Sequence, residues 1–454
     1  MCIFYYEHDK IDHMENNFDT ICAIITPISI SAVSIIRISG DNAFKIADEI
    51  FTKKIKPKMI NYGHIIDNNA ILDEVIVLPF LGPHSYTGED VVEIQTHGNP
   101  IIVNSILELI LSKGARLAAR GEFTKRAFLN HRIDLSQAEA VLDIINSKST
   151  KSAQNALSNL GGYLKDKINS IKKDLIDIYS KVIASIDFPE DVAEVDKNYI
   201  VSICNDKIHE IDTILSNSKG HDFIRDGLNA CLIGRPNVGK SSLFNALLNY
   251  TRAIVTPIEG TTRDTIKETI NLNGYLINFI DTAGIRDKEE ADLVEQIGID
   301  NSIDSIVLSD IVLFLYENSL DEIDKKLIEL SKDKQVLFIK TKCDNDLNQD
   351  IENTLKISSI SGFGINDLKE KISSIISNLI PNDTNYTTNK RQQTCLLRAK
   401  ESLLNVLKTA EFDDMPDLFA IDLKQSILAL DEITGAVLTD TILDNIFDNF
   451  CIGK

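Results

Sequence analysis

The feature that most constrains this chain is the segment Gly234–Ser242, GRPNVGKSS, which contains the complete GxxxxGK[ST] pattern of a phosphate-binding loop. An apolar run at 230–233 precedes it, and a helical pattern follows from about Ser241. Glycines at 234 and 239 permit the tight turn that points backbone N–H groups at phosphates, and the helix adds the positive end of its dipole. Lys240 is then expected to reach the outer phosphates, and the Ser241 hydroxyl to coordinate magnesium. The spacing predicts a nucleoside triphosphate site.

Composition limits the partners. The chain has 454 residues, is 43% hydrophobic and carries a formal net charge of −21, which suits about three domains. This negative charge argues against non-specific binding along nucleic acid. An RNA partner would therefore need a local basic patch. The segment 113–132 offers one, although a solvated helix face explains it equally well. Against the single acid Glu122 it holds Lys113, Arg116, Arg120, Lys125, Arg126 and Arg132.

The cysteines and the first residues indicate a reducing, aqueous compartment. The seven cysteines include no CxxC pair, so neither a zinc site nor a disulfide framework is expected. The first twenty residues carry five acids and lack the apolar core of a signal peptide. No stretch reaches the length of a membrane span. We expect a cytoplasmic protein with no membrane contact.

Changes of pattern divide the chain into four segments. Residues 1–120 mix short β-branched runs with helical stretches, which is typical of an α+β domain. In 121–223 apolar residues recur at three- and four-residue steps, as the helices of a bundle require. Strands and helices alternate in 224–380, which predicts a parallel α/β nucleotide domain. After a polar linker at 382–393, the remainder of 381–454 is helical again. The simplest account is a nucleotide domain inserted into a helical domain whose two parts flank it.

Two downstream motifs favour GTP over ATP. Asp281-Thr282-Ala283-Gly284 follows an apolar strand, where a carboxylate holds magnesium through water and a glycine N–H senses the terminal phosphate. Thr341-Lys342-Cys343-Asp344 resembles the NKxD motif, whose aspartate accepts hydrogen bonds from the guanine N–H and NH2 groups. Guanine selectivity then rests mainly on Asp344, while Thr341, in place of the usual asparagine, bears on affinity. Ser358-Ser359 stands where GTPases usually have Ser-Ala, so the Ser359 N–H is expected to serve the base.

A third segment is expected to act as a switch. Thr256–Asp264, TPIEGTTRD, resembles the second GTPase motif, in which the Thr262 hydroxyl completes the magnesium shell when the terminal phosphate is present. Ile285 follows the glycine at 284, where Ras-like proteins carry the glutamine that orients the attacking water. Another residue must position that water here.

These elements, in this order, resemble the MnmE (TrmE) family of tRNA-modifying GTPases, and the resemblance extends from Asp19 to Lys454. The terminal FCIGK is highly specific, because ordinary GTPases have no reason to end this way. The resemblance implies a P-loop, Ras-like G domain inserted in a helical bundle domain, with an N-terminal α+β domain that binds folate and dimerises. Outside the G domain it rests on IIRISG (35–40), SYTGEDVVEIQTHG (85–98), GEFTKRAFLNHRIDLSQAEA (121–140), DFPED (187–191), EITG (432–435) and FCIGK (450–454).

The resemblance also implies a hydrolytic centre shared by two copies of the chain. In this family the G domains dimerise across the nucleotide, and a potassium ion replaces an arginine finger, which is sensible beside phosphate charge. The resemblance assigns potassium to Asn237, Thr256, Ile258 and Thr261, and gives Glu295 the role of positioning the hydrolytic water. Lys240 and Asn237 complete the catalytic set. The implied nucleotide contacts are Asn237, Val238, Gly239, Lys240, Ser241, Ser242, Thr256, Thr261, Thr262, Asp281, Thr282, Ala283, Gly284, Lys342, Asp344, Ser358 and Ser359, with Ser241 and Thr262 on magnesium.

A reduced folate is the second implied ligand. Members of the family bind 5-formyl-tetrahydrofolate and use 5,10-methylene-tetrahydrofolate as one-carbon donor, and the matching positions are Arg37, Glu93, Arg132 and Lys454. A carboxylate suits the pterin amidine edge and cations suit the glutamyl carboxylates. The stretch ISISA at 28–32 is less glycine-rich than usual, and Arg120 replaces the usual proline, so the pterin pocket is expected to differ.

The function implied is that of a homodimeric, potassium-stimulated GTPase. With the flavin-dependent MnmG partner, in a heterotetramer, it would add an aminomethyl or carboxymethylaminomethyl group to carbon 5 of the wobble uridine of certain tRNAs. The alternative is an Era- or Der-like RNA-binding GTPase in ribosome assembly, although an RNA-binding appendage is missing; a folate-binding scaffold that regulates partners is a third reading. Cys451 is either a nucleophile toward uridine or, more in keeping with its neighbours, a structural cysteine.

Overall fold

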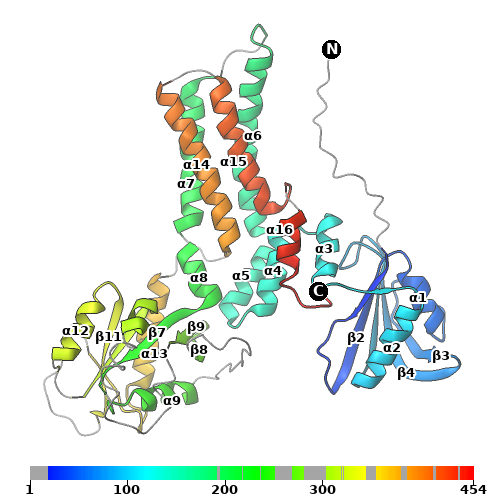
Figure 1. The fold of residues 1–454 in the computed structure, drawn as a ribbon, viewed down its shortest axis with the longest axis horizontal. Coiled ribbons are helices and arrows are strands. Elements are labelled where there is room, and N and C mark those ends of the chain that lie inside the picture. Colours follow the sequence, from blue (N-terminus) through cyan, green and yellow to red (C-terminus); the bar gives the residue numbers. More distant parts are fainter. Residues whose placement is uncertain are drawn as a thin grey trace. The chain divides into compact units, whose positions relative to one another are not determined.

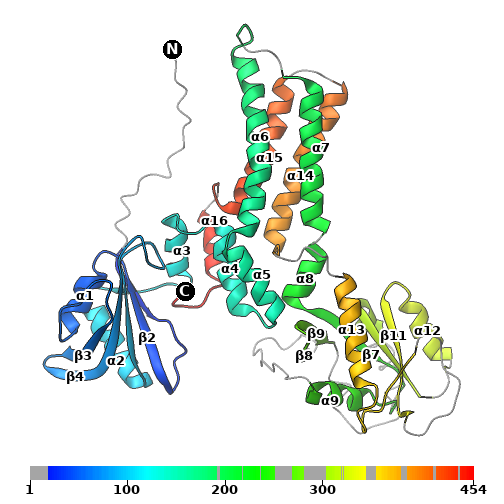
Figure 2. The ribbon, with the colours of Figure 1, turned by 180° about the vertical axis from the view of Figure 1, so that it is seen from behind.

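The computed structural model describes residues 19–191, 195–216, 218–235, 237–250, 268–280, 303–317, 320, 322–343, 354–379, 386–412, 416–437 and 440–454. The chain divides into two compact units, one of residues up to Leu142 with Thr434–Lys454 and the other of Asp143–Ile433. Figures 1 and 2 show their elements from opposite sides.

The first unit is built on a six-stranded sheet in the order β3-β4-β5-β2-β1-β6. Alternation along the strands gives it one apolar face: in β4, Val75 and Val77 are buried while Ile76 is exposed. Helices α1 (Ala43–Ile50) and α2 (Pro100–Ser112) pack on that apolar face. The strands are β1 (Ile21–Ile24), β2 (Ser31–Ser39), β3 (Asn61–Asp67), β4 (Ala70–Phe80), β5 (Val91–Gly98) and β6 (Arg116–Leu117).

The C-terminal segment returns to this unit. Helix α16 (Asp440–Phe447) packs with α4 (Leu135–Asn146) through Phe447 and Phe450, beside α3 (Glu122–Leu129). Gly121 precedes α3 with φ 62°, and a Cβ there would lie 2.6 Å from the carbonyl oxygen of Phe447. Only glycine fits that close approach. The GEF and FCIGK motifs therefore meet, and their backbones are bridged between Arg120 and Ile452.

The second unit contains a four-helix bundle with one continuous core. Helices α6 (Tyr163–Asp187), α7 (Lys197–Ser216), α14 (Lys390–Phe412) and α15 (Pro416–Thr434) run alongside one another in both views. The core combines residues from before the nucleotide domain, such as Leu164 and Ile211, with residues from after it, such as Leu403 and Leu430. The two helical parts of the sequence therefore fold as one body. The shorter helices α5 (Thr150–Leu160) and α8 (Ser218–Asp226) precede the nucleotide domain.

The nucleotide domain has a six-stranded sheet in the order β12-β11-β10-β7-β9-β8, parallel except for β8. Its central strand β10 is buried at every position, as expected for a strand covered on both faces. The strands are β7 (Leu228–Ile233), β8 (Glu268–Leu272), β9 (Tyr275–Phe279), β10 (Ile311–Tyr316), β11 (Gln335–Lys340) and β12 (Leu355–Lys356), and the described helices are α9 (Lys240–Tyr250), α12 (Glu322–Leu330) and α13 (Ile365–Leu379).

The predicted fold class is confirmed: an α+β N-terminal part, and a Ras-like domain inserted between two parts of a helical bundle. The boundaries after residues 120, 223 and 380 stay predictions. The predicted linker at 382–393 is too long, because α14 already begins at Lys390. Asn389 explains this early start, since its side chain accepts from the Gln392 N–H while the Gln392 side chain accepts from the Asn389 N–H. Among the described residues, no helix is both long and apolar enough to cross a membrane.

Candidate functional site

The phosphate-binding loop leaves β7 and leads directly into α9. Its turn depends on positive φ angles at Gly234 (149°), Asn237 (62°) and Gly239 (103°). A Cβ at position 234 would lie 2.3 Å from the carbonyl oxygen of Leu315, so glycine is required for packing against β10. Ser241 and Ser242 lie in the first turn of α9, where free backbone N–H groups favour anions.

Lys240 lies back along the loop. Its Nζ donates to the carbonyl oxygens of Gly234 and Arg235, at 2.5 and 2.9 Å. Burial lowers the pKa of this lysine below its ordinary value. A phosphate beside Nζ would favour the ammonium form, so nucleotide binding and protonation of Lys240 reinforce one another.

Two contacts hold the loop from outside. Arg235 pairs with Asp324 of α12, whose side chain is 4% exposed, through Nη2–Oδ2 at 2.8 Å. Thr341, which replaces the asparagine of the NKxD motif, donates from Oγ1 to the main-chain oxygen of Val238 at 2.6 Å. The base-recognition motif and the phosphate loop are thus tied together at a buried position.

The remaining described residues of the base motifs lie at the ends of β11 and β12. Lys342 has φ 58°, and its Nζ pairs with Glu317 at 2.7 Å. Ser358 is buried and Ser359 half-buried directly after β12. Several predicted nucleotide contacts therefore share the carboxyl edge of one sheet, where such domains bind ligands. They are Asn237, Val238, Gly239, Lys240, Ser241, Ser242 and Lys342.

Ten predicted positions lie outside the described residues: Thr256, Ile258, Thr261, Thr262, Asp281, Thr282, Ala283, Gly284, Glu295 and Asp344.

The first unit brings the four predicted folate ligands together. Arg37 of β2 and Glu93 of β5 are register partners on the face away from α1 and α2, and they form an ion pair of 2.8 Å. Arg37 and Arg132 both lie against the ring of Tyr86, at 4.7 and 5.5 Å from its centroid. Lys454 is close enough to Arg37 and Glu93 for both charges to act on it; burial first, and then Arg37, lower its pKa.

An unsatisfied donor marks this cluster as a candidate anion and pterin site. Arg37 is 8% exposed, and its Nη1 has no hydrogen-bond partner among the described residues. A buried guanidinium nitrogen is costly to leave without an acceptor. A carboxylate ligand would supply one, while Glu93 could accept from an amidine edge. The residues present therefore fit a folate.

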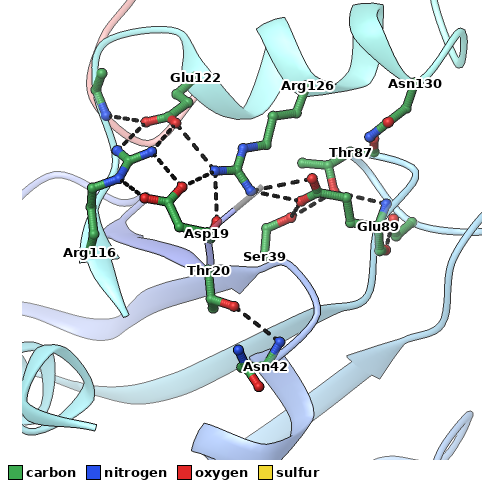
Figure 3. A network of polar contacts seen from close by, with 12 residues as sticks. Asp19, Thr20, Ser39, Asn42, Thr87, Glu89, Arg116, Glu122, Arg126 and Asn130 are labelled. Atoms are coloured by element: carbon green, nitrogen blue, oxygen red, sulfur yellow. Dashed lines mark hydrogen bonds and ion pairs between the residues drawn. The ribbon is translucent and has the colours of Figure 1, made fainter. Parts of the chain in front are cut away.

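Figure 3 shows a network of hydrogen bonds and ion pairs that holds together the segments around this site. Arg126 of α3 is 1% exposed and lies between Asp19, Glu89 and Glu122, with ion-pair distances of 3.1 to 3.3 Å. Arg116 joins Asp19 to Glu122 from the other side. The network thereby connects the start of the sheet, the loop before β5 and helix α3, the helix whose C-terminal end leads to Arg132.

The basic segment 113–132 is mostly neutralised by these contacts. Lys113, Arg116, Lys125 and Arg126 each pair with acids, and Arg132 donates to the carbonyl oxygen of Tyr86. Only Arg120 lies exposed without such a partner within the described part of the chain. Most of these cations are therefore paired within the chain, while the choice between an RNA patch and a helix face stays a prediction. Cys451 is exposed, which does not agree with its interpretation as a buried structural cysteine.

Sequence reasoning missed Tyr86, Phe123, Arg126 and the Thr341–Val238 contact. Tyr86 and Phe123 both underlie the Arg37 guanidinium, and the two lie within the SYTGED and GEF motifs. An arginine stacked on aromatic rings leaves no periodic signal in sequence. The position of Arg126 among basic residues suggested exposure, whereas three surrounding acids from distant segments bury it.

A mostly parallel sheet with a GxxxxGKS turn at the carboxyl end of a central strand defines a P-loop nucleoside triphosphatase. Comparison with known proteins makes this class specific. The family model described as "GTP-binding protein TrmE N-terminus" matches residues 20–132, and the model described as "MnmE helical domain" matches residues 135–451.

Curated relatives match nearly end to end. The tRNA modification GTPase MnmE of Streptococcus thermophilus (strain CNRZ 1066) is 40% identical over 96% of this chain and 99% of its own length. That of Alkaliphilus oremlandii (strain OhILAs) is 41% identical with the same coverage. Among solved structures, the G domain of the T. maritima FeoB iron transporter matches 32% of this chain and 97% of its own at 27% identity and a TM-score of 0.24. This chain belongs to the MnmE, or TrmE, family of tRNA modification GTPases.

Proposed function

We propose that this GTPase is activated by potassium, works as a cytoplasmic homodimer, and with an MnmG flavoprotein forms a heterotetramer that modifies the wobble uridine of certain tRNAs. The group added to carbon 5 is aminomethyl or carboxymethylaminomethyl. The observation that carries the proposal is the presence in one chain of two charged sites: the phosphate loop, and the Arg37–Glu93–Lys454 cluster with its unpaired guanidinium nitrogen.

Folate use is supported by the chemistry of the second site. Glu93 is suited to hold the pterin edge, and Arg37, Arg132 and Lys454 to hold carboxylates. A 5,10-methylene-tetrahydrofolate bound there would supply the one-carbon unit. Tyr86 and Phe123 hold the Arg37 guanidinium in place by stacking beneath it. The half-buried ion pair of Arg37 with Glu93 sets the spacing of the two charges before any ligand arrives.

Metal use is supported by loop geometry. Asn237, in the left-handed region, lies within the loop, and Ser241 lies in the first turn of α9. These two residues fit potassium and magnesium respectively, with oxygen donors of the kind both ions prefer. Asn237 and Ser241 belong to the described residues. Thr256, Ile258 and Thr261 would complete the potassium set, and Thr262 the magnesium set. A cation beside the transferring phosphate stabilises charge that develops during hydrolysis.

Hydrolysis rates in potassium and in sodium test this proposal. GTP turnover at equal ionic strength should be at least about tenfold faster in potassium chloride, if a site-bound cation replaces an arginine finger. Equal rates would contradict the cation site. Glu295→Ala should abolish turnover while GDP affinity is unchanged, and the neighbouring acid variant Glu290→Ala serves as the matched control. An active Glu295→Ala protein would exclude the role proposed for that residue.

A further inference from the structure

The loop between α1 and β3 is strongly basic in an otherwise acidic chain. Residues 52–60 read TKKIKPKMI and contain Lys53, Lys54, Lys56 and Lys58, while the whole chain has a net charge of −21. Lys54, Lys56 and Lys58 are exposed, and none forms an ion pair within the described part of the chain. This loop therefore differs from the segment 113–132, whose cations are mostly paired.

The loop is held in a fixed shape. Asn61, 9% exposed, accepts from the Lys56 N–H and donates to the carbonyl oxygens of Lys56 and Met59. The buried Ile55 anchors its middle, and the Ile55 N–H donates to the Asp48 side chain at 2.7 Å. Because the backbone of this loop is already ordered, less conformational entropy is lost when its lysines bind a ligand.

An apolar cavity of about 410 Å³ adjoins the lysines. Its lining includes Lys58, Met59 and Ile60 from the loop and Leu78, Pro79 and Phe80 from the end of β4. Phe80 is 38% exposed and Ile60 72% exposed, so the cavity has an open, partly aromatic wall. Lys58 is the loop lysine that lines the cavity, and Lys54 and Lys56 lie on the same loop. Lysines beside an aromatic and aliphatic hollow are a combination that binds unpaired nucleotides.

The cavity adjoins the candidate folate site. Leu78 pairs in register with Glu93, which pairs in register with Arg37. All three lie on the sheet face away from α1 and α2, and direct cross-strand neighbours have Cβ atoms about 5 Å apart. A base in the cavity would therefore lie beside the residues proposed to hold the one-carbon donor.

We propose that this lysine loop and cavity bind an unpaired RNA segment, with phosphates on Lys54, Lys56 and Lys58 and a base against Phe80. The inference rests on the proposed function and supplies the RNA contact that it requires. A second copy of this chain fits the surface less well, because lysine is unfavourable in the centre of protein interfaces and a two-fold contact would bring two such loops together.

The test uses the full-length protein and a fluorescently labelled anticodon stem-loop RNA with uridine at the wobble position. The variant Lys54→Ala/Lys56→Ala/Lys58→Ala should bind it at least about tenfold more weakly near 0.15 M salt, and the slope of log affinity against log salt should fall by about 2. A matched control removes the same charge from exposed bundle lysines: Lys173→Ala/Lys408→Ala/Lys424→Ala. This control should bind like the unmodified protein.

The cavity is tested separately. Phe80→Ala should weaken RNA binding by about fivefold or more, because stacking on one base is lost. Ile71→Ala removes an exposed apolar side chain from the other end of β4 and should have no effect. GTP turnover should be unchanged in every variant.

Outcomes separate this inference from the function on which it rests. Unmodified protein that binds the RNA, together with a lysine variant that binds equally well, would overturn the inference alone. The same holds if the lysine variant keeps RNA affinity but loses self-association in sedimentation. Failure of the unmodified protein to bind any tRNA fragment, alone or with MnmG, would contradict the proposed function and this inference with it.

Discussion

The hydroxyl of Thr341 donates a 2.6 Å hydrogen bond to the main-chain oxygen of Val238, and so joins the first residue of the base motif to the phosphate loop. Thr341 is 4% exposed, and its Cβ would lie 3.8 Å from a Cβ at Gly239. A threonine at this position therefore makes a contact to the loop with a shorter side chain than asparagine has. Although Thr341 departs from the NKxD pattern, its side chain still forms a hydrogen bond to the phosphate loop.

Thr341→Val should weaken GDP binding by roughly tenfold. The substitution keeps the shape but leaves the buried Val238 carbonyl without a donor, at a cost of about 1–3 kcal/mol. Thr341→Ser and Thr341→Asn retain a donor and should bind within about threefold of the unmodified protein. Calorimetric titration with GDP measures all three. Equal affinity in Thr341→Val would show that the contact does not support the loop.

Arg126→Met should destabilise the first unit strongly. Loss of the guanidinium leaves the largely buried Glu89 carboxylate without its cationic partner, which costs about 3–5 kcal/mol. Hydrogen exchange of β1, β2 and β5 reports this locally, because a chain with several domains does not unfold in one step. The neighbouring Lys125→Met removes only the exposed pair with Asp444 and should cost at most about 1 kcal/mol. Similar protection in the two variants would refute the central position of Arg126.

Stability of the first unit should fall in acid. The hydrogen bond from Arg116 lowers the pKa of Asp19, and in Glu122 the raising effect of burial is outweighed by Arg116 and the Ala119 N–H. Both carboxyls bind fewer protons folded than unfolded, so their stabilisation is complete above their ordinary values of 3.8 and 4.5 and is lost as pH falls toward the lowered ones. Arg116→Gln should flatten exchange protection against pH below about pH 5. An Arg116→Gln profile parallel to that of Arg120→Gln would contradict this.

Folate affinity should decline in alkaline solution. Burial, followed by the charge of Arg37, lowers the pKa of Lys454 below its ordinary 10.5, so the ammonium is lost at a lower pH than in an exposed lysine. An anionic ligand binds the ammonium form better, so affinity falls as pH rises through the lowered pKa. Lys454→Arg keeps the charge and should remove this dependence. Fluorescence titration with 5-formyl-tetrahydrofolate from pH 7 to 10 checks it; an identical decline in both proteins would assign the titration to another group.

Sequence patterns predicted the structural features that depend on residues close together in the chain. The turn at Gly234 and Gly239, the start of α9 and the continuous apolar run of β10 each follow from neighbouring residues, and the structure agrees with them. Contacts that join distant segments could not be read in this way. Arg126 is surrounded by acids from residues 19, 89 and 122, and its burial depends on tertiary packing.

The candidate sites show the same division. Arg37, Glu93 and Lys454 were expected together through resemblance, whereas the supporting rings of Tyr86 and Phe123 emerge only from the fold. Asn389 gives a further case: its reciprocal pairing with Gln392 starts α14 within a stretch whose polar composition predicted a linker. The lysine loop at 52–60 was not singled out from the sequence, because its exposure beside a cavity depends on the fold.

Mass spectrometry of tRNA nucleosides tests the central claim most directly. In a strain that lacks this gene, the aminomethyl-type groups at carbon 5 of the wobble uridine should disappear, and the intact gene should restore them. A copy with Glu295→Ala, which we expect to bind GTP without hydrolysing it, should fail to restore them. Unchanged wobble uridines in the strain without the gene would contradict the account.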